Sequence, residues 1–416
     1  MPPPATFTVP SRFAPPLSVA SVNTRWRSAA LATPQLWQSL AINASTRALL
    51  RGLPYARFCE TWLGRAGGFP LSLSIKALGV EAANWLIDYI RASSALLREL
   101  DLQFGSVLQI LSFPPAKYPL LERVSIDTPQ GGILISFLDA PLLRRVKLSK
   151  YTARVHLRRE QLTSFRCDSI DVLTFLEFFR DARELVSARF VVGYRIGSGW
   201  PRTVYKLPCL QSLVLETTED HEYWQMNTVY LGALQNLRTP ALEDFTLIFP
   251  RRNERQPREE TISRPFMGFV GQTPLRLHTL TLSFMPVSTS TLILCLRATP
   301  SLVQLKLGPT EMIDLAEFIA SFVEFPHLLL PCLESMHVVN EAGATNPTPE
   351  TLVEMLSYRW GSAIGARRRS FRMALANSIP NSWVVARIES QPRFAELKAE
   401  GMQLYVGKME MPVDDL

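Results

Sequence analysis

The chain has 416 residues, of which 47% are of hydrophobic types and 19% are charged. These values are those of a globular protein that is long enough to bury a large core. The formal net charge of +7 is too small and too evenly mixed along the chain to indicate nucleic acid as the partner.

The N-terminal part predicts short helices followed by a strand. Residues 1–16 are rich in proline, and we expect them to be disordered. They lack the charged head and continuous apolar stretch of a signal peptide. Residues 17–32 place apolar side chains at roughly helical spacing, and Thr33 with Pro34 predicts the start of a short helix over residues 34–40. A helix is expected over residues 55–65, and alternating apolar residues after it predict a first strand.

Most of the remaining chain consists of a repeated unit with the pattern L-x-x-L-x-L, clearest in LPCLQSLVLE at residues 207–216. The last two apolar slots are two residues apart, so on a strand they share one face and the residue between them lies on the other. Ten copies occur, with starts 19 to 35 residues apart, which is near the leucine-rich-repeat period. The slots are Leu97, Leu100 and Leu102; Leu121, Val124 and Ile126; Leu143, Val146 and Leu148; Leu162, Phe165 and Cys167; Leu185, Ala188 and Phe190; Leu210, Leu213 and Leu215; Leu242, Phe245 and Leu247; Leu277, Leu280 and Leu282; Leu302, Leu305 and Leu307; and Leu333, Met336 and Val338.

Prolines and helical segments separate these strands. Six copies have proline two residues before the first slot, at Pro119, Pro141, Pro208, Pro240, Pro300 and Pro331. Because proline cannot continue a helix, we interpret these positions as helix-to-strand switches. Helices are expected over residues 81–92, 171–182, 290–298, 311–322 and 349–360. Crossovers that all run in one direction give parallel strands and right-handed connections. The sequence therefore predicts an α/β fold, a right-handed leucine-rich-repeat solenoid with strands on the concave face and helices on the convex face.

Motifs that indicate catalysis or metal binding are not found. The sequence lacks G-x-S-x-G, a P-loop, H-E-x-x-H and G-x-G-x-x-G. Its five histidines are scattered, and its five cysteines show no C-x-x-C spacing. We therefore expect no enzyme activity, no cofactor and no metal. Reduced thiols indicate an intracellular protein, cytoplasmic or nuclear. Residues 277–296 lack charge but contain many Ser and Thr residues, so we expect core and not a membrane span.

Residues 14–42, APPLSVASVNTRWRSAALATPQLWQSLAI, resemble the second half of an F-box, as found in fungal F-box proteins with leucine-rich repeats. The similar elements are the helix ending in R-W-R, the pair Ala29-Ala30 and the Thr-Pro-x-Leu-Trp pentad at residues 33–37. WLGRAGGFPLSLSI, which continues to residue 75, and residues 392–407 also resemble that group. The resemblance implies a substrate-recognition adaptor of a cullin ubiquitin ligase that docks on the Skp-type linker protein. Its linker-binding residues would be Val22, Trp26, Leu36 and Trp37.

The sequence departs from the F-box pattern in one respect. An F-box begins with a helix that carries Leu-Pro, an acidic residue and a Leu-Ile-Phe cluster, and nothing before Ala14 resembles it. The first helix is therefore expected to be missing or truncated, which leaves open whether the chain still binds the linker. The expected organisation is a disordered N-terminus at residues 1–16, a partial F-box-like segment at 17–66, an irregular solenoid at 67–391, and a capping helix and strand with a short tail at 392–416.

The residue between the last two apolar slots of each copy is expected on the open face of the sheet. Reading this column gives Asp101, Ser125, Lys147, Arg166, Arg189, Val214, Thr246, Thr281, Lys306 and His337. The basic run Lys147, Arg166 and Arg189, flanked by Arg123 and Arg145, predicts a site for an acidic or phosphorylated target. Neutralisation by Asp127 and Asp168, or by water, is the alternative.

Three functions remain open at this stage. The first is the F-box-type adaptor that binds target proteins through the concave face, and the second is a leucine-rich-repeat scaffold with no ligase role. The third is a nucleic-acid binder, which rests on a pI of 9.3 and the basic column. It lacks the aromatic residues that interleave with charge in single-strand binders. The expected partners are therefore the linker protein and an unknown target, without nucleic acid or membrane.

Overall fold

A computed structural model of the chain describes most of its residues. The described ranges are 15–44, 53–77, 88–104, 116–127, 135–152, 154–193, 203–217, 229–249, 259–271, 276–285, 287–309, 313–324, 329–340, 348–361, 372–377, 390–399 and 403–406. They form an α/β structure with parallel strands, arranged as two compact units. Met1–Ile170 and Asp181–Leu185 belong to the first unit, and Asp171–Arg180 and Val186–Leu416 to the second.

The first unit contains a row of parallel strands in the order β1-β2-β3-β4-β6-β8. Their bounds are Ser39–Ala44, Leu71–Ala77, Leu97–Phe104, Arg123–Asp127, Arg145–Leu148 and Ser164–Asp171. A separate parallel pair joins β5 (Ile135–Ser136) to β7 (Val155–His156). The helical elements are α1 (Leu17–Val22), α2 (Thr24–Leu31), η1 (Pro34–Trp37), α4 (Leu53–Arg65), η2 (Ser94–Leu96) and η3 (Arg159–Gln161).

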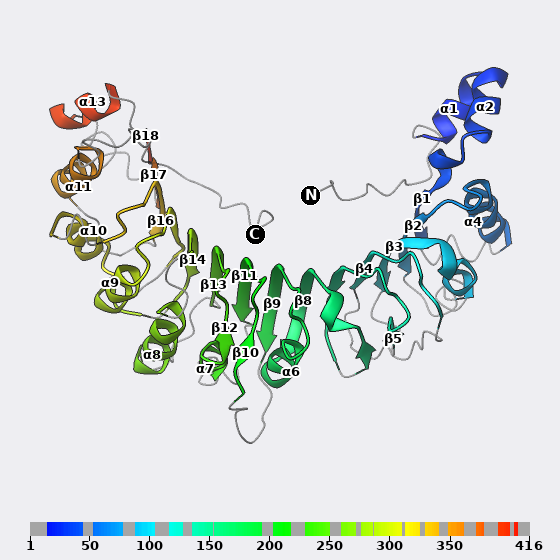
Figure 1. The fold of residues 1–416 in the computed structure, drawn as a ribbon. Coiled ribbons are helices and arrows are strands. Elements are labelled where there is room, and N and C mark those ends of the chain that lie inside the picture. Colours follow the sequence, from blue (N-terminus) through cyan, green and yellow to red (C-terminus); the bar gives the residue numbers. More distant parts are fainter. Residues whose placement is uncertain are drawn as a thin grey trace. The chain divides into compact units, whose positions relative to one another are not determined.

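The second unit contains the parallel row β9-β11-β13-β14-β15-β16-β17-β18. Their bounds are Ser187–Gly193, Ser212–Thr217, Asp244–Ile248, Thr279–Ser283, Gln304–Leu307, Ser335–Asn340, Arg372–Asn377 and Gln403–Val406. A short pair joins β10 (Tyr205–Lys206) to β12 (Leu237–Arg238). The helices are α6 (Val172–Phe178), α7 (Val229–Leu234), α8 (Glu259–Val270), α9 (Thr289–Arg297), α10 (Leu315–Glu324), α11 (Pro349–Gly361) and α13 (Pro392–Ala399). Helices α7 to α11 lie along one side of the strand row (Figure 1).

The apolar slots of the repeated unit form the core of each unit. All three slots in all ten copies are buried, and the most exposed of them, Leu333, has 7% of its surface accessible. Neighbouring copies pair slot by slot, as Leu100 with Val124 in the first unit and Leu213 with Phe245 in the second. The prediction of an α/β fold with parallel strands is therefore confirmed.

The expected helix-to-strand switch holds for Pro300 and Pro331, which follow α9 and α10, whereas Pro141, Pro208 and Pro240 follow the short strands β5, β10 and β12. All six prolines share one local geometry. Each is the second residue of a four-residue turn that ends at the first leucine slot. The N–H of that leucine donates to the carbonyl three residues earlier, as from Leu121 to Tyr118 at 3.3 Å and from Leu242 to Thr239 at 3.1 Å. Proline suits this position because its fixed φ is already that of the turn. The prolines therefore specify the turn before the strand, whether or not a helix precedes it.

Two other local expectations require correction. The helix expected over residues 17–32 is broken at Asn23, which is extended and whose side chain accepts the N–H of Trp26 at 2.9 Å as the N-cap of α2. The helix expected over residues 34–40 is only the 3₁₀ turn η1, followed directly by strand β1. Thr33 does not cap it, because its hydroxyl donates to the carbonyl of Ala29 at 2.7 Å. The expected disorder of residues 1–16 and the first half of the helix at 81–92 fall almost entirely outside the described residues.

Candidate functional site

The N-terminal helices of the first unit expose apolar side chains. Val22 at the end of α1 is 64% exposed, Trp26 on α2 is 54% exposed, and Leu36 on η1 is 36% exposed. Leu31, at the end of α2, is also exposed. We call these four residues the apolar patch. Exposed apolar side chains gathered on adjacent short helices are a feature of protein-binding surfaces.

Trp37 does not belong to this patch, because its side chain is fully buried. Its indole N–H donates to the carbonyl of Ala30 at 2.8 Å, and its ring meets that of Trp62 on α4 edge to face. The guanidinium carbon of Arg65 lies 4.5 Å from the centre of the Trp37 ring. Trp37 therefore fixes η1 against α4, and only three of the four expected linker-binding side chains are accessible.

Two arginines flank Trp26 in the sequence of α2. Arg25 and Arg27 on α2 are exposed, and the guanidinium of Arg27 donates to the carbonyl of Ala20 at 3.0 Å. The first acidic residue of the whole sequence is Glu60. The described segment 15–44 thus contains arginines and no carboxylate side chain, so an acidic surface complements the charge of these helices.

The polar face of the strand row in the first unit carries the predicted basic residues. One line of register partners runs through Glu99, Arg123, Arg145 and Ser164 on β3, β4, β6 and β8. The next line runs through Asp101, Ser125, Lys147 and Arg166 on the same strands. The register predicted from the sequence is therefore correct within this unit, and four basic side chains converge on β4, β6 and β8.

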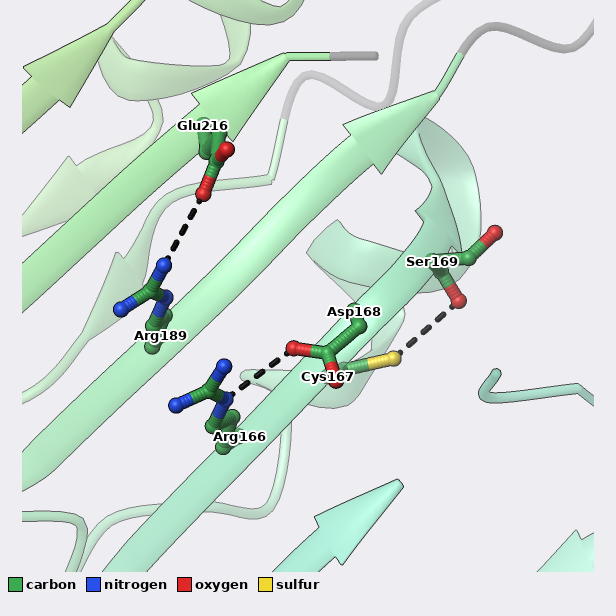
Figure 2. Close-up of polar contacts among 6 residues, drawn as sticks. All are labelled: Arg166, Cys167, Asp168, Ser169, Arg189 and Glu216. Carbon is green, nitrogen blue, oxygen red and sulfur yellow. Dashed lines mark hydrogen bonds and ion pairs between the residues drawn. The ribbon is translucent and has the colours of Figure 1, made fainter. Parts of the chain in front are cut away.

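Two of these four cations have an acidic partner on the protein. The guanidinium of Arg123 lies 3.6 Å from the carboxylate of Glu99, whose side chain is only 7% exposed. Arg166 donates from Nε to Oδ1 of Asp168 at 3.0 Å, and Figure 2 shows this pair along β8. The expected neutralisation by Asp168 therefore occurs, whereas that by Asp127 is not seen among the described residues.

Arg145 and Lys147 differ from the other two. Among the residues that the structure describes, neither forms an ion pair with an acidic side chain. Arg145 is half-buried and Lys147 is exposed. They lie two residues apart on the same face of β6, within the acid-free sequence RRVKLSK at residues 144–150. We call Arg145 and Lys147 the β6 cation pair.

Arg189 lies in the second unit and is neutralised there. Its guanidinium donates to the carboxylate of Glu216 on β11 at 3.2 Å (Figure 2). Its register partner is Val214, and the same line continues through Thr246, Thr281, Lys306 and His337. The column predicted from the sequence is thus correct within this unit too, but most of its members here are uncharged.

Sequence reasoning missed Glu99 and Glu216 as partners of the arginines. Both lie on the outward face, in the columns next to the one that contains Lys147 and Arg166. Glu99 is two residues before Asp101, and Glu216 is two residues after Val214. Reading the neighbouring outward positions together with that column would have found them. Arg25, Arg27 and Leu31 were also missed, and the long acid-free N-terminus was the signal for the two arginines.

The described residues show no cluster for metal binding, and three of the five thiols are buried. They contain no group of three or more His, Cys, Asp or Glu residues that could hold a metal ion. Burial raises the pKa of the Cys59, Cys167 and Cys295 thiols to about 12, so these thiols are not nucleophiles near neutral pH. The Cys167 thiol donates to the carbonyl of Ser169 (Figure 2).

Within the described part of the chain, no helix is both long and apolar enough to cross a membrane. No protein-family model matches the sequence, and no curated protein matches it.

Proposed function

We propose that the chain is an F-box-type substrate-recognition adaptor of a cullin-RING ubiquitin ligase. In this proposal the parallel strands and their helices are successive leucine-rich repeats of one right-handed solenoid, whose strand face binds target proteins. The ten in-register copies of the L-x-x-L-x-L unit, buried at every slot, support the repeat assignment.

The observation that carries the ligase role is the exposure of Val22, Trp26 and Leu36 on α1, α2 and η1. These side chains lie in the segment that resembles an F-box, and burying them requires a partner. The adaptor has no chemistry of its own. It acts by holding the target near the ligase, which raises the effective concentration of the two reacting proteins.

A leucine-rich-repeat scaffold with no ligase role is the alternative. The polar strand faces favour it, because binding a target there requires no linker protein. The two functions differ in one property, which is whether the apolar patch binds the Skp-type linker protein.

The test is co-purification of the full chain with a purified Skp-type linker protein. We expect capture by the wild type and a loss of at least about tenfold in affinity for Trp26→Ala, because a central tryptophan is often a binding hot spot. Leu294→Ala is the matched control, since Leu294 on α9 is also 54% exposed but lies in the second unit. Failure of the wild type to bind the linker, or equal binding by Trp26→Ala, would favour the scaffold.

A further inference from the structure

We propose that strand β1 is an open edge of the first unit and accepts an extended, acidic segment of a partner protein as an additional strand. The binding surface is the backbone edge of one strand, so it differs from the apolar patch and from the outward strand face. The inference goes beyond the proposed function and does not depend on the ligase role. It concerns association at a strand edge and involves no membrane.

The backbone of β1 has one edge that faces away from its neighbour. Within the described part of the chain, β1 is the first strand of the parallel row and pairs only with β2 (Figure 1). In a parallel pair, alternate residues direct their N–H and C=O groups to the same neighbouring strand. Ser72 donates its N–H to the carbonyl of Gln38 at 2.8 Å, so Gln38 and then Leu40 face β2. The N–H and C=O of Ala41 are therefore directed at the opposite edge.

The backbone groups of Ala41 have no hydrogen-bond partner among the residues that the structure describes. The carbonyl of Ser39, which is directed the same way, accepts the indole N–H of Trp62 at 3.3 Å. Ala41 is partly accessible, whereas the side chains of Leu40 and Ile42 are buried. The edge is therefore open, although the core beneath β1 is already closed.

Strand β1 also lacks the features that usually protect an edge strand from pairing with another chain. Its sequence, SLAINA, contains no charged residue and no proline. Its pairing with β2 continues without a bulge from Ser39–Ser72 to Ala44–Ala77. A regular, uncharged edge of this kind is a template for strand addition, in which main-chain hydrogen bonds supply the affinity. An added strand would give Ala41 the partners that it lacks.

The charge of this end of the chain favours an acidic occupant. Residues 1–87 contain eight Lys or Arg residues and two acidic residues, Glu60 and Glu81. Arg25 and Arg27 are exposed on α2, which η1 joins to β1. Two copies that paired through their β1 edges would bring two such segments together, and their like charges would repel. An acidic segment of another protein has the complementary charge.

The test measures binding of a fluorescein-labelled peptide of alternating glutamate and valine to the full chain by fluorescence anisotropy. Lysine in place of glutamate should weaken binding by at least about tenfold. Alternate N–H groups of an extended strand are directed at opposite edges. N-methylation of one alternating set of peptide amides should therefore abolish binding, and methylation of the other set should leave it unchanged. Binding that depends on charge alone would respond equally to both sets.

Ala41→Pro tests the edge from the side of the chain. Proline removes the N–H that is directed at the open edge, whereas the neighbouring residues that face β2 keep theirs. We expect a loss of at least about tenfold in peptide affinity. Ala41→Val keeps the N–H and is the matched control, and thermal unfolding compares the two variants. If Ala41→Pro does not fold, the two methylated peptides still decide the question on the wild type.

Two further variants separate this site from the apolar patch. Arg25→Glu/Arg27→Glu should weaken binding of the acidic peptide, whereas Trp26→Ala should weaken only linker capture. Ala41→Pro should leave linker capture unchanged. Equal binding of the two methylated peptides, or full peptide affinity in a folded Ala41→Pro chain, would overturn the open edge. Light scattering that shows a wild-type oligomer lost in Ala41→Pro would assign the edge to a second copy and overturn the acidic occupant.

Discussion

The indole rings of Trp37 and Trp62 meet edge to face, with centroids 4.9 Å apart and planes 74° apart. The two N–H groups donate to the carbonyls of Ala30 and Ser39, so the pair joins α2 and β1 to α4. The same short segment that exposes Trp26 is thus anchored by Trp37. Docking and folding in this segment depend on different tryptophans, which makes them separable by mutation.

We expect Trp37→Ala to lower the free energy of unfolding by about 3–5 kcal/mol, because it removes a fully buried ring and its hydrogen bond. Trp26→Ala should change the same quantity by less than about 1 kcal/mol, since more than half of this side chain is exposed. Denaturant unfolding followed by far-UV circular dichroism measures both. Equal destabilisation by the two substitutions would mean that Trp26 is part of the core, against the docking role.

The repeats could be predicted in detail because a parallel ladder repeats one simple rule. Apolar slots two residues apart must share the buried face, so the sequence alone was sufficient to place Lys147 opposite Arg166 and Lys306 opposite His337. The N-terminal segment has no such repetition. The break at Asn23 depends on one side chain capping α2.

The strand character of β1 depends on pairing with β2, which is in register from Ser39–Ser72 to Ala44–Ala77. Strand formation of this kind is decided by contacts with a distant segment, and local pattern does not reveal it. Which arginines form ion pairs could likewise not be predicted from one column of outward residues. It depends on acidic residues such as Glu99 and Glu216, which lie on neighbouring strands.

The prolines before the strands should stabilise the folded protein, because they restrict the backbone of the unfolded chain. Pro208 is the second residue of the turn from Leu207 to Leu210. Pro208→Ala should lower the free energy of unfolding by about 0.4–1 kcal/mol, because alanine leaves the unfolded backbone more freedom. Pro265 lies inside α8 and lacks the N–H that a helix needs, so Pro265→Ala should have the opposite sign. Chemical denaturation measures the free energy of unfolding of both variants. A change of the same sign in the two would contradict the different roles given to Pro208 and Pro265.

Gly308 follows β15, where it lies against the neighbouring strand β14. Its N–H donates to the carbonyl of Leu282 at 2.6 Å. A Cβ at this position would clash with the Ser283 hydroxyl and lie 2.8 Å from its Cβ. Gly308→Ala should therefore destabilise the fold by about 1–3 kcal/mol. Ser283→Gly in the same chain should recover part of this loss, and a double-mutant cycle by thermal unfolding measures the coupling. Strictly additive effects would show that the two positions do not touch.

His337 should make stability depend on pH. Burial, and secondarily the positive charge of its register partner Lys306, lowers the pKa of His337 below the ordinary 6.5. On the other side its register partner is the uncharged Ala374, and its own strand offers Ser335 and Val339 on the same face.

Because the unfolded chain binds the proton more readily than the folded chain, the stability from neutral His337 is complete above pH 6.5 and is lost as pH falls through the lower folded-state pKa. Wild type should therefore lose more stability than His337→Gln between pH 7 and pH 5.5. NMR titration of the imidazole gives the pKa directly. Lys306→Met should raise it while leaving it below 6.5, since burial remains, and a wild-type pKa at or above 6.5 would refute the prediction.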